Sequence, residues 1–421
     1  MSDWLKQNWS GHVTFAAARS HRPTSLGQVQ QIVRTASKVR VIGSRHCFND
    51  IADTTGDLLW LGDLGNTVRI DRERATATVD AGMTYEALCP ILDQAGFALP
   101  NLASLKHVTV VGACMTATHG SGDAIGNLAT AVAGLEMVSA DGDLVELSRE
   151  RDGDTFLGAV VALGALGVVT KVTLDLQPAF LVQQDNYEKL PFGELCAHFD
   201  EIFSAGYSVS LFTTWRHDWI DTVWVKQRVG NLSPVAAPGN LFGAALASAR
   251  PSGEPPADRV LTPFARPGRW HERLPHYFFK DARAIGNELQ SEYFVPRRHA
   301  VAALQAVAGL RAGLAPILGL SEIRTVRADQ LWLSSAYGQD VVGLHFNWLK
   351  NWEGVRAFLP ALEAALAPFG ARPHLGKLFA MPPAQLENVY PRWTDFRKLR
   401  QKFDPRGKFA NRFVEKYVMG A

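Results

Sequence analysis

The stretch that most constrains the fold is a short apolar run that ends at a glycine, VRVIGSRHCFND at residues 39–50. Its first four residues are typical of a β-strand, and the glycine, small and polar residues that follow are typical of a tight loop. Such a loop can aim successive backbone N–H groups at one point, which binds phosphate oxygens without a charged side chain. His46 lies in the middle of the loop. Taken alone, the stretch is equally an ordinary strand-to-loop turn with a surface histidine.

Helices and strands alternate on both sides of this stretch. Ser25 to Gln28 has the pattern of a capping box, and apolar residues follow it at helical spacing as far as the Val39 strand. A second helix is expected from Thr84 to Gly96. Further strands are expected at residues 58–61, 75–81, 135–139 and 144–147, and within 162–176. The Asp-Gly pair at 141–142 predicts a hairpin between the third and fourth of these strands.

A second unusual segment, residues 100–122, is dominated by small residues. Glycines and alanines leave the backbone bare, as is needed where a flat and bulky ligand lies close against the chain. The alternative is a buried strand and bend. That alternative accounts for one or two glycines but not for the whole run.

The composition and the pattern of the sequence change near Pro178. Aromatic-rich strands are expected at 207–215 and 222–226, and residues 229–269 are interpreted as a long loop that is functional or mobile. Later strands are expected at 288–295, 322–327 and 341–348, with helices at 297–312 and 354–369. This pattern predicts an α+β second domain. The final segment, FDPRGKFANRF, is expected to be a short turn with aromatic anchors that packs back on the first domain.

Length and composition limit the classes of function. A chain of 421 residues exceeds what one hydrophobic core usually supports, which favours two domains. A net charge of +2 is too small for a nucleic-acid or membrane surface, and no apolar run is long enough to cross a bilayer. The four cysteines lack CxxC spacing, and no metal site is indicated. We therefore expect a cytoplasmic monomer that binds a small molecule and neither nucleic acid nor membrane.

Seven short segments carry a family resemblance. They are GSRHCFN at 43–49, then PNLASL, THGSG, GALGVVT, SEIRT, RPHLGK and FDPRGKF. In this order and spacing they resemble the alditol oxidase branch of the vanillyl-alcohol oxidase flavoprotein family, whose relatives include the aldonolactone oxidases. The resemblance runs from end to end. It implies an α+β fold with an FAD-binding domain at 1–178, a substrate-covering cap domain at 179–374, and a C-terminal segment at 375–421 that returns to the first domain.

The resemblance also implies the cofactor site. His46 would carry FAD through the flavin 8α-methyl group, the backbone from Val41 to Cys47 would hold the pyrophosphate, and Val168 and Val169 would lie near the adenine or ribose. The implied cofactor-binding residues are Val41, Ile42, Gly43, Ser44, Arg45, His46, Cys47, Ser104, Gly112, Thr116, Thr118, His119, Gly120, Gly122 and Val169.

Two residues of the loop depart from the family pattern. The family usually has glycine at Arg45 and serine at Cys47, so Arg45 must tolerate the backbone angle that the loop requires. Residues 103–106 contain no cysteine that could form a second flavin link. We therefore expect a single covalent link.

The chemistry of alcohol oxidation points to a second group of residues. A proton must leave the oxygen and a hydride must leave the carbon, and a flavin takes the hydride at N5. Glu322 and Arg324 are two apart, so a strand would point both to one face. With Lys377 they would form a carboxylate and two cations, and burial beside another cation can lower a lysine pKa far enough for it to act as a base. The alternative is a surface ion pair with a lysine elsewhere.

The resemblance places these residues in the substrate cavity. It implies Glu322, Arg324 and Lys377 as catalytic residues, and the substrate-binding residues it implies are Ser104, Glu322, Arg324, Asn347 and Lys377. Asn347 stands where the family usually has threonine and Leu375 where it has tryptophan, so Leu375 is expected to open space in the cavity.

Three further residues near this cavity have no single predicted role. His345 and His374 are either polar walls of the cavity or satisfied structural histidines. Ala103 occupies the position that the family uses as a gate for dioxygen, and an alanine there is compatible with an oxidase.

These observations predict FAD-dependent oxidation of a terminal hydroxyl of a linear polyol, such as xylitol or sorbitol, to the aldose, with dioxygen reduced to hydrogen peroxide. The first alternative is an aldonolactone-type oxidase or dehydrogenase. The second is a non-catalytic flavin- or sugar-binding protein, and the coexistence of His46, Glu322, Arg324 and Lys377 argues against it.

Overall fold

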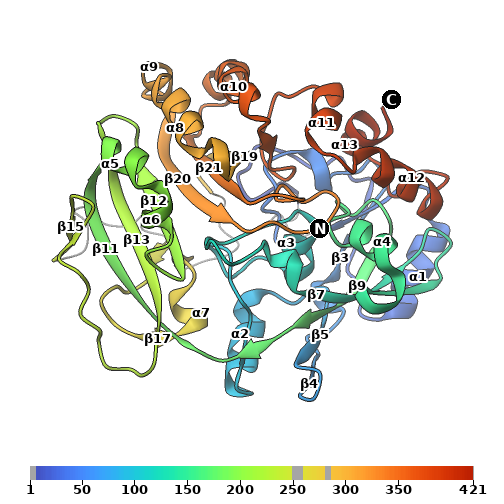
Figure 1. Ribbon diagram of the computed structural model, residues 1–421. Helices are drawn as coiled ribbons and strands as arrows, with labels where there is room; N and C mark the ends of the chain where they lie inside the picture. Colours follow the sequence, from blue (N-terminus) through green and yellow to red (C-terminus); the bar gives the residue numbers. More distant parts are fainter. Residues whose placement is uncertain (1–5, 249–258, 280–285, 421) are drawn as a thin grey trace.

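The computed structural model describes residues 6–248, 259–279 and 286–420, and its elements fall into two groups (Figure 1). One group surrounds a five-stranded sheet and holds most of the N-terminal half. The other is built on a ten-stranded sheet. The C-terminal helices, red in Figure 1, lie on the side of the N-terminal group, away from strands β11 and β13.

The chain begins with a small parallel sheet in the order β1-β3-β2. Its strands are β1 Arg19–His21, β2 Val39–Ile42 and β3 Asp57–Trp60, and helix α1 Leu26–Thr35 connects β1 to β2. The Ser25 side chain caps α1 by accepting from the Gln28 N–H. The Gln28 side chain, however, accepts from the Thr24 N–H at 2.8 Å, so the reciprocal half of the predicted capping box does not form with Ser25.

The five-stranded sheet is antiparallel, in the order β4-β5-β9-β7-β8. Its strands are β4 Val68–Asp71, β5 Thr76–Asp80, β7 Val132–Val138, β8 Leu144–Ser148 and β9 Val168–Asp175. The helices of this part are α2 Tyr85–Gln94, α3 Val110–Met115 and α4 Arg149–Val160. Gly142 has φ +82 in the turn between β7 and β8, as the Asp-Gly signal predicted. Thr84 caps α2 and Gly96 follows its end with φ +86, which confirms that helix.

The ten-stranded sheet has the order β14-β15-β11-β13-β12-β20-β21-β19-β22, with β17 paired to β11. Its strands are β11 Leu181–Pro191, β12 Ser208–Thr213, β13 Trp219–Val229, β14 Asn240–Leu241, β15 Ala244–Leu246, β17 Gly268–Arg269, β19 Glu288–Pro296, β20 Leu318–Val326, β21 Val341–Leu349 and β22 Arg372–Pro373. Two further pairs are β6 Phe97–Ala98 with β10 Gln177–Pro178, and β16 Arg259–Leu261 with β18 Tyr277–Phe279.

Helices cover one face of the large sheet. They include α5 Phe192–Ala197, α6 Phe199–Phe203, α8 Ala300–Ala308, α9 Arg311–Leu314 and α10 Trp352–Leu366. Helix α7 Trp270–Arg273 packs instead in the core of the N-terminal part. Apolar residues of β12, β20 and β21, such as Leu211, Ile323 and Phe346, share a buried core with α6, α8 and α10. Because side chains alternate along a strand, the residues between them face the opposite side of the sheet. That opposite face is polar.

Two sequence predictions in this part needed correction. The predicted loop at 229–269 contains the short strands β14 to β17, and its residues 249–258 lie outside the described part. The predicted helix at 297–312 is a 3₁₀ turn, Arg297–His299, followed by α8 and α9. Gly309 and Leu310 separate those two helices.

The C-terminal segment contains α11 Pro383–Val389, α12 Trp393–Phe403, α13 Arg412–Val414 and a π-helical turn, Glu415–Met419. Its predicted turn packs on the start of the chain. The Val39 N–H donates to the Lys408 carbonyl at 2.8 Å, and Asn411 Nδ2 donates to the Asp53 carbonyl at 2.8 Å. Other 3₁₀ turns lie at Asp50–Ala52, Leu61–Asp63, Leu128–Ala131 and Ala367–Phe369. Within the described residues, every helix is too short or too polar to cross a bilayer.

Candidate active site

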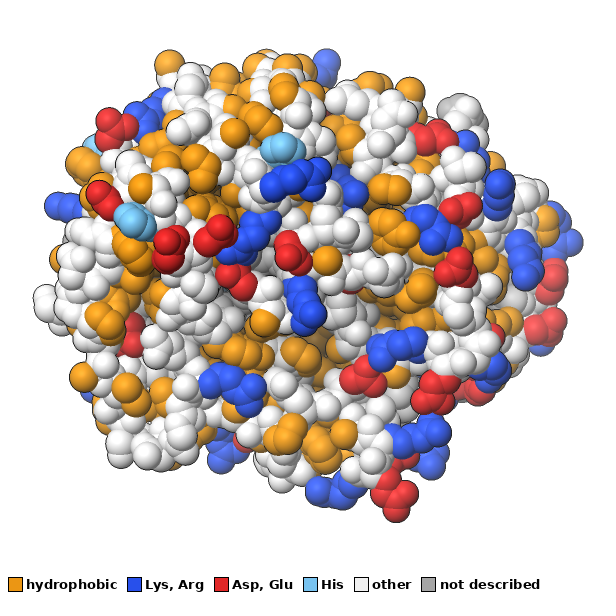
Figure 2. All heavy atoms as spheres, in the orientation of Figure 1, with side chains coloured by type: hydrophobic (Ala, Val, Ile, Leu, Met, Phe, Trp, Pro, Cys, Tyr) orange, Lys and Arg blue, Asp and Glu red, His pale blue; other side chains and the backbone are white. Residues whose placement is uncertain are grey.

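A cavity of about 300 Å³ lies between the N-terminal part of the chain and the polar face of the ten-stranded sheet. We call the lining residues between positions 8 and 169 the N-terminal wall, and those between positions 212 and 377 the cap wall. On the face of the molecule shown in Figure 2, acidic and basic side chains are interspersed.

The N-terminal wall is organised by the loop after β2, which packs against the start of α3. A Cβ atom built on Gly43 would overlap Thr109 Oγ1, and one on Gly112 would lie 2.6 Å from the same oxygen. A Cβ atom at either position would therefore force Thr109 or the backbone near it to shift. Arg45 has φ +64, the left-handed region that costs a non-glycine residue about 1–2 kcal/mol.

Contacts with the N-terminal segment hold Arg45 in this conformation. Its carbonyl accepts from the Trp9 N–H at 2.7 Å, and its guanidinium donates to the Gln7 carbonyl at 3.1 Å. The left-handed angle accounts for the glycine that the resembling family usually has here.

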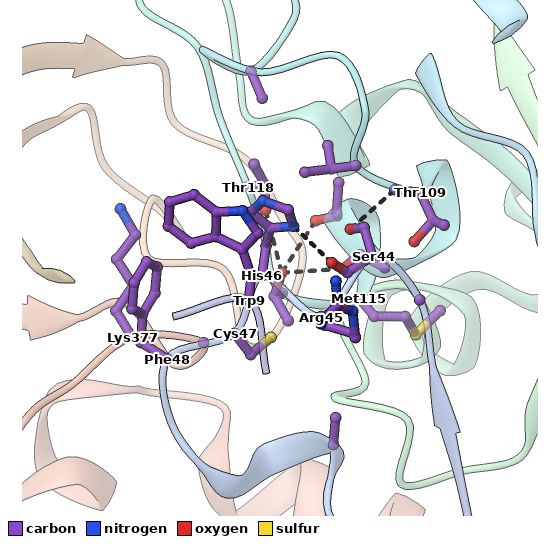
Figure 3. Close-up of a pocket in the computed structure, with 18 of the residues that line it drawn as sticks. Trp9, Ser44, Arg45, His46, Cys47, Phe48, Thr109, Met115, Thr118 and Lys377 are labelled. Atoms are coloured by element: carbon purple, nitrogen blue, oxygen red, sulfur yellow. Dashed lines mark hydrogen bonds between the residues drawn. The ribbon is translucent and has the colours of Figure 1, made fainter. Parts of the chain in front are cut away.

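His46 lies at the centre of an aromatic stack in the N-terminal wall. The Trp9 ring stacks on it at 5.0 Å between centroids, and the two rings lie together in Figure 3. His46 Nδ1 lies 2.8 Å from the Ser44 carbonyl, and His46 Nε2 lies 2.8 Å from His107 Nε2. A carbonyl only accepts, so Nδ1 carries the hydrogen and Nε2 accepts from His107. Burial, together with His107, lowers the pKa of His46 well below its usual value, which leaves a neutral ring with a nitrogen lone pair.

The N-terminal wall is positively charged. Its described lining residues include Arg40 and Arg45 and contain no aspartate or glutamate. Arg40 is buried and donates to the carbonyls of Leu163, Gly164 and Phe409 at 2.7–3.0 Å. Burial lowers the pKa of Arg40 to about 10, which keeps it protonated at neutral pH. The wall therefore suits an anionic group.

Most of the predicted cofactor-binding residues line this wall. They are Val41, Ile42, Gly43, Ser44, Arg45, His46, Cys47, Ser104, Gly112, Thr116, Thr118, His119 and Val169. Gly120 and Gly122 are not among the residues that line the cavity. A Cβ atom on Gly120 would lie 2.5 Å from the Leu102 carbonyl, and the Gly122 N–H donates to the Thr325 carbonyl at 3.0 Å. These two glycines allow close backbone packing, as they would in the buried bend considered as the alternative.

The cap wall is built by strand register. Glu292 of β19 and Glu322 of β20 both lie opposite His345 of β21, so the three form one row across the sheet. The neighbouring row contains Gln290 and Asn347. All five side chains line the cavity.

Glu292, which the sequence analysis missed, is the centre of a buried charge cluster. Lys377 Nζ lies 2.8 Å from Glu292 Oε2. Arg324 donates to Glu292 Oε1 at 2.9 Å, and His119 Nε2 lies 3.1 Å from that oxygen. Burial alone would raise the pKa of Glu292, but the charges of Lys377, His119 and Arg324 outweigh burial and hold it well below its usual value. Burial lowers the pKa of Lys377, and Glu292 opposes that shift.

Gly343 explains how Arg324 reaches Glu292 across an intervening strand. Arg324 lies opposite Gly343 of β21, and a Cβ atom there would lie 3.3 Å from Glu292 Oε1. A larger side chain at Gly343 would separate the two charges. The only sequence signal for this arrangement was a lone glycine in a predicted strand.

The cap wall also holds buried polar atoms that lack hydrogen bonds. Among the described residues these include Glu322 Oε1, Arg324 Nε and both ring nitrogens of His345. Glu322 Oε1 lies 3.4 Å from Arg324 Nε and 3.3 Å from His276 Nδ1, but the geometry is not that of a hydrogen bond. An unpaired buried polar group costs about 1–3 kcal/mol. A ligand with several hydroxyl groups would pair with these atoms.

The remaining predicted residues are divided between the cavity and the core. Ser104 Oγ accepts from Arg324 at 3.3 Å. His374 Nδ1 accepts from the Gly376 N–H at 3.1 Å, which is the satisfied alternative considered for it. Leu375 does not line the cavity. Its side chain, 2% exposed, packs in the core of the N-terminal part, so the expectation that it opens the cavity is wrong.

Comparisons with known proteins agree with this picture. Residues 17–148 match the FAD binding domain family, and residues 275–417 match the D-arabinono-1,4-lactone oxidase family. The chain is 42% identical to alditol oxidase of Streptomyces sp. over 98% of this chain and 99% of that protein. It is 30% identical to L-gulono-1,4-lactone dehydrogenase of Mycobacterium tuberculosis, with 98% of each covered, and 27% identical to L-gulonolactone oxidase of Mus musculus, with 97% of each covered.

The fold is shared with solved flavoprotein structures. Cholesterol oxidase from Brevibacterium sterolicum superposes with a TM-score of 0.79 at 17% identity, covering 98% of this chain and 96% of that one. Fold and site together define an FAD-binding oxidoreductase with the α+β architecture that the sequence predicted. Within that class, the chain belongs to the vanillyl-alcohol oxidase flavoprotein family, in the branch that contains alditol oxidase and the aldonolactone oxidases.

Proposed function

We propose that this protein oxidises a terminal hydroxyl of a linear polyol, such as xylitol or sorbitol, to the aldose, with dioxygen reduced to hydrogen peroxide. The observation that carries the proposal is the cap wall, where buried carboxylate, guanidinium and imidazole atoms lack hydrogen bonds. The greater similarity to alditol oxidase, 42% against 27–30% for the lactone enzymes named above, favours a polyol over a lactone.

The residues of the N-terminal wall fit FAD. The loop Val41 to Cys47 would hold the pyrophosphate, and the charges of Arg40 and Arg45 would balance its negative charge. When bound, FAD supplies a two-electron acceptor that takes the hydride from the alcohol carbon at N5 and is reoxidised by dioxygen. Ala103 also lines the cavity, and its small side chain leaves room for dioxygen.

His46 is proposed as the point of covalent attachment. Its neutral ring and the lone pair at Nε2 suit bond formation to a flavin methyl group. The test is acid precipitation of the purified protein. We expect the yellow colour to stay with the polypeptide, and His46→Ala to release it into the supernatant while still binding some FAD. Complete release from the wild type would overturn the covalent link.

Lys377 and Arg324 are proposed to contact the reacting hydroxyl, with Glu322 and Ser104 holding its neighbours. Donors near the oxygen stabilise the charge that develops as its proton leaves. Lys377 and Glu292 are close enough to titrate as one unit, so the proton is proposed to pass to this pair. Glu292 also keeps the two cations together in a buried site.

An oxygen-electrode screen tests the whole proposal. Xylitol and sorbitol should drive oxygen uptake with one hydrogen peroxide formed per oxygen consumed. Turnover of sugar lactones in place of polyols would support the aldonolactone alternative. Reduction of an artificial acceptor without oxygen uptake would identify a dehydrogenase.

The proposal also covers the location of the protein, its oligomeric state and its domain boundaries. We propose a cytoplasmic monomer with an FAD-binding domain at 1–178, a cap domain at 179–374 and a returning segment at 375–421. Light scattering should give the mass of one 46.1 kDa chain. A dimer mass would contradict the monomer, and cell fractionation tests the location.

A further inference from the structure

The cavity has a second polar cluster at one end of the cap wall. Asn347 Nδ2 donates to Glu288 Oε2 at 2.9 Å, and Gln290 Nε2 donates to Glu288 Oε1 at 3.0 Å. Asn347 and Gln290 line the cavity, whereas Glu288 lies behind them and is 9% exposed. One carboxylate therefore holds two amides that face the ligand.

The chemistry of a carboxylate fixes which way these amides point. A carboxylate oxygen only accepts hydrogen bonds, so each amide must turn its NH₂ group toward Glu288. The carbonyl oxygens of Asn347 and Gln290 are then on the sides directed away from Glu288. Two acceptors with a negative charge behind them suit a hydroxyl donor. They disfavour a carbonyl oxygen and, more strongly, a carboxylate.

The position of this cluster along the strands relates it to the proposed reacting end. The row with Gln290 and Asn347 is two residues from the row with Glu292, His345 and Glu322. Two strand residues span about 6.5 Å, which is less than the length of an extended five- or six-carbon chain with its terminal oxygens. The far hydroxyl of such a chain can reach the amides while its other end lies among the charges.

We propose that Glu288 is a positioning residue that orients the Asn347 and Gln290 amides as acceptors, so that the far end of the cavity selects a neutral hydroxyl and rejects a carbonyl or carboxylate. This inference rests on the proposed function, because it assumes that the cap wall binds a polyol. It assigns to this chain its own means of excluding sugar acids and lactones, through two residues, Glu288 and Gln290, that the sequence analysis did not single out.

The test is Glu288→Gln, an isosteric change that replaces a carboxylate, which only accepts hydrogen bonds, by an amide, which also donates them. The Asn347 and Gln290 amides can then each rotate so that the carbonyl oxygen, instead of the NH₂ group, points toward residue 288. We expect kcat/KM for xylitol to fall about ten-fold, mainly through KM. Inhibition by xylonate, measured by competition and by the change it causes in the flavin spectrum, should strengthen about ten-fold. Glu353→Gln, the same charge change on the exposed surface of α10, is the control and should alter neither value.

A second variant distinguishes an effect on the orientation of the amides from an effect of the Glu288 charge alone. Asn347→Thr removes one of the two amides, so Glu288→Gln should have a smaller effect in that background than alone. Equal effects in both backgrounds, or unchanged xylitol KM and xylonate affinity in Glu288→Gln, would overturn the inference. A wild-type protein that oxidises no polyol would instead overturn the proposed function. The spectral titration with xylonate needs no turnover, so it would still decide the role of Glu288.

Discussion

The two walls of the cavity are built in opposite ways. The N-terminal wall is rich in glycine and small side chains around the Trp9–His46 stack, and its two arginines face no carboxylate among the lining residues of that wall. The cap wall is made of long side chains, most of them on adjacent strands, in which Glu292 and Glu322 lie among two cations, Arg324 and Lys377, and several histidines. The first shape suits a large, fixed, anionic cofactor. The second suits a small ligand whose hydroxyl groups complete a network of hydrogen bonds.

Because of this difference, the two walls should be sensitive to different kinds of substitution. A backbone site is damaged by added atoms, because a new Cβ has no space. A side-chain site is damaged by lost atoms, because each partner left behind is buried and charged. Substitutions should therefore separate cofactor retention from the rate of chemistry.

The largest effect is expected from removing a cation of the cap wall. Lys377→Met and Arg324→Ala should each lower the rate of flavin reduction by about 10²-fold or more, equivalent to roughly 3 kcal/mol. Flavin content should stay near that of the wild type, because Lys377 bonds to the loop after β2 through its carbonyl, which the substitution retains. Stopped-flow reduction and the visible spectrum measure the two quantities. Lys350→Met, at an exposed position, is the matched control, and near wild-type reduction in both site variants would mean that the site is misplaced.

The opposite pattern is expected in the N-terminal wall. Gly43→Ala forces a methyl group against Thr109, and overpacking of this kind costs about 1–3 kcal/mol. FAD content per chain should fall, whereas the reduction rate of the molecules that retain FAD should change less. Gly27→Ala, with no atom within 4 Å of the new Cβ, is the control and should keep full flavin content. A fully loaded Gly43→Ala protein with slow chemistry would contradict the division between the walls.

The histidines of the cap wall should make stability depend on pH. Burial lowers the pKa of His276 from 6.5 to about 3, so the folded state keeps it neutral while the unfolded state takes up a proton below pH 6.5. Stability should therefore fall as pH drops from 6.5 toward 3, by up to about 1.4 kcal/mol per pH unit for this residue.

Guanidinium unfolding of the holoprotein at pH 7 and pH 5.5 measures this slope. His276→Asn, which retains a donor toward Glu322, should reduce the slope by about 1 kcal/mol per pH unit. An unchanged slope would mean that His276 takes up its proton in the folded state.

The smallest effect is expected at Arg45. Arg45→Gly relieves the left-handed conformation but removes the hydrogen bond to the Gln7 carbonyl. We expect a net change in unfolding free energy below about 1 kcal/mol and full flavin content, because the backbone N–H groups of the loop and the charge of Arg40 remain. Loss of FAD in this variant would show that the arginine charge, rather than the loop, holds the cofactor.

Much of the fold followed from local patterns. The strand-to-loop stretch at Val39 and the helix capped by Thr84 have short-range signals, and both are confirmed. Glu322 and Arg324 were found together because alternation along one strand is visible in the sequence. The long segment at 229–269 was taken for a loop because its strands are only two or three residues long.

The rest depends on register between distant strands. Glu292 contacts Arg324 only because Gly343 lies between them, and no local pattern reveals which residues of three strands lie opposite one another. Leu375 lies two residues from Lys377, yet its side chain is in the core, since the direction of each residue in a turn depends on tertiary packing. Gly120 and Gly122 lie outside the cavity lining for the same reason.

The central claim is that the cap wall binds the hydroxyl groups of a polyol, and a graded series of alcohols tests it most directly. The measurement is kcat/KM by oxygen uptake for sorbitol, xylitol, glycerol, 1-propanol and hexanol under one set of conditions. Each missing hydroxyl that leaves a buried group unpaired should lower the value by about ten-fold or more, so xylitol and sorbitol should exceed glycerol, and glycerol should exceed 1-propanol. Equal activity on hexanol and sorbitol, or no activity on any polyol, would contradict the claim even if FAD were linked to His46.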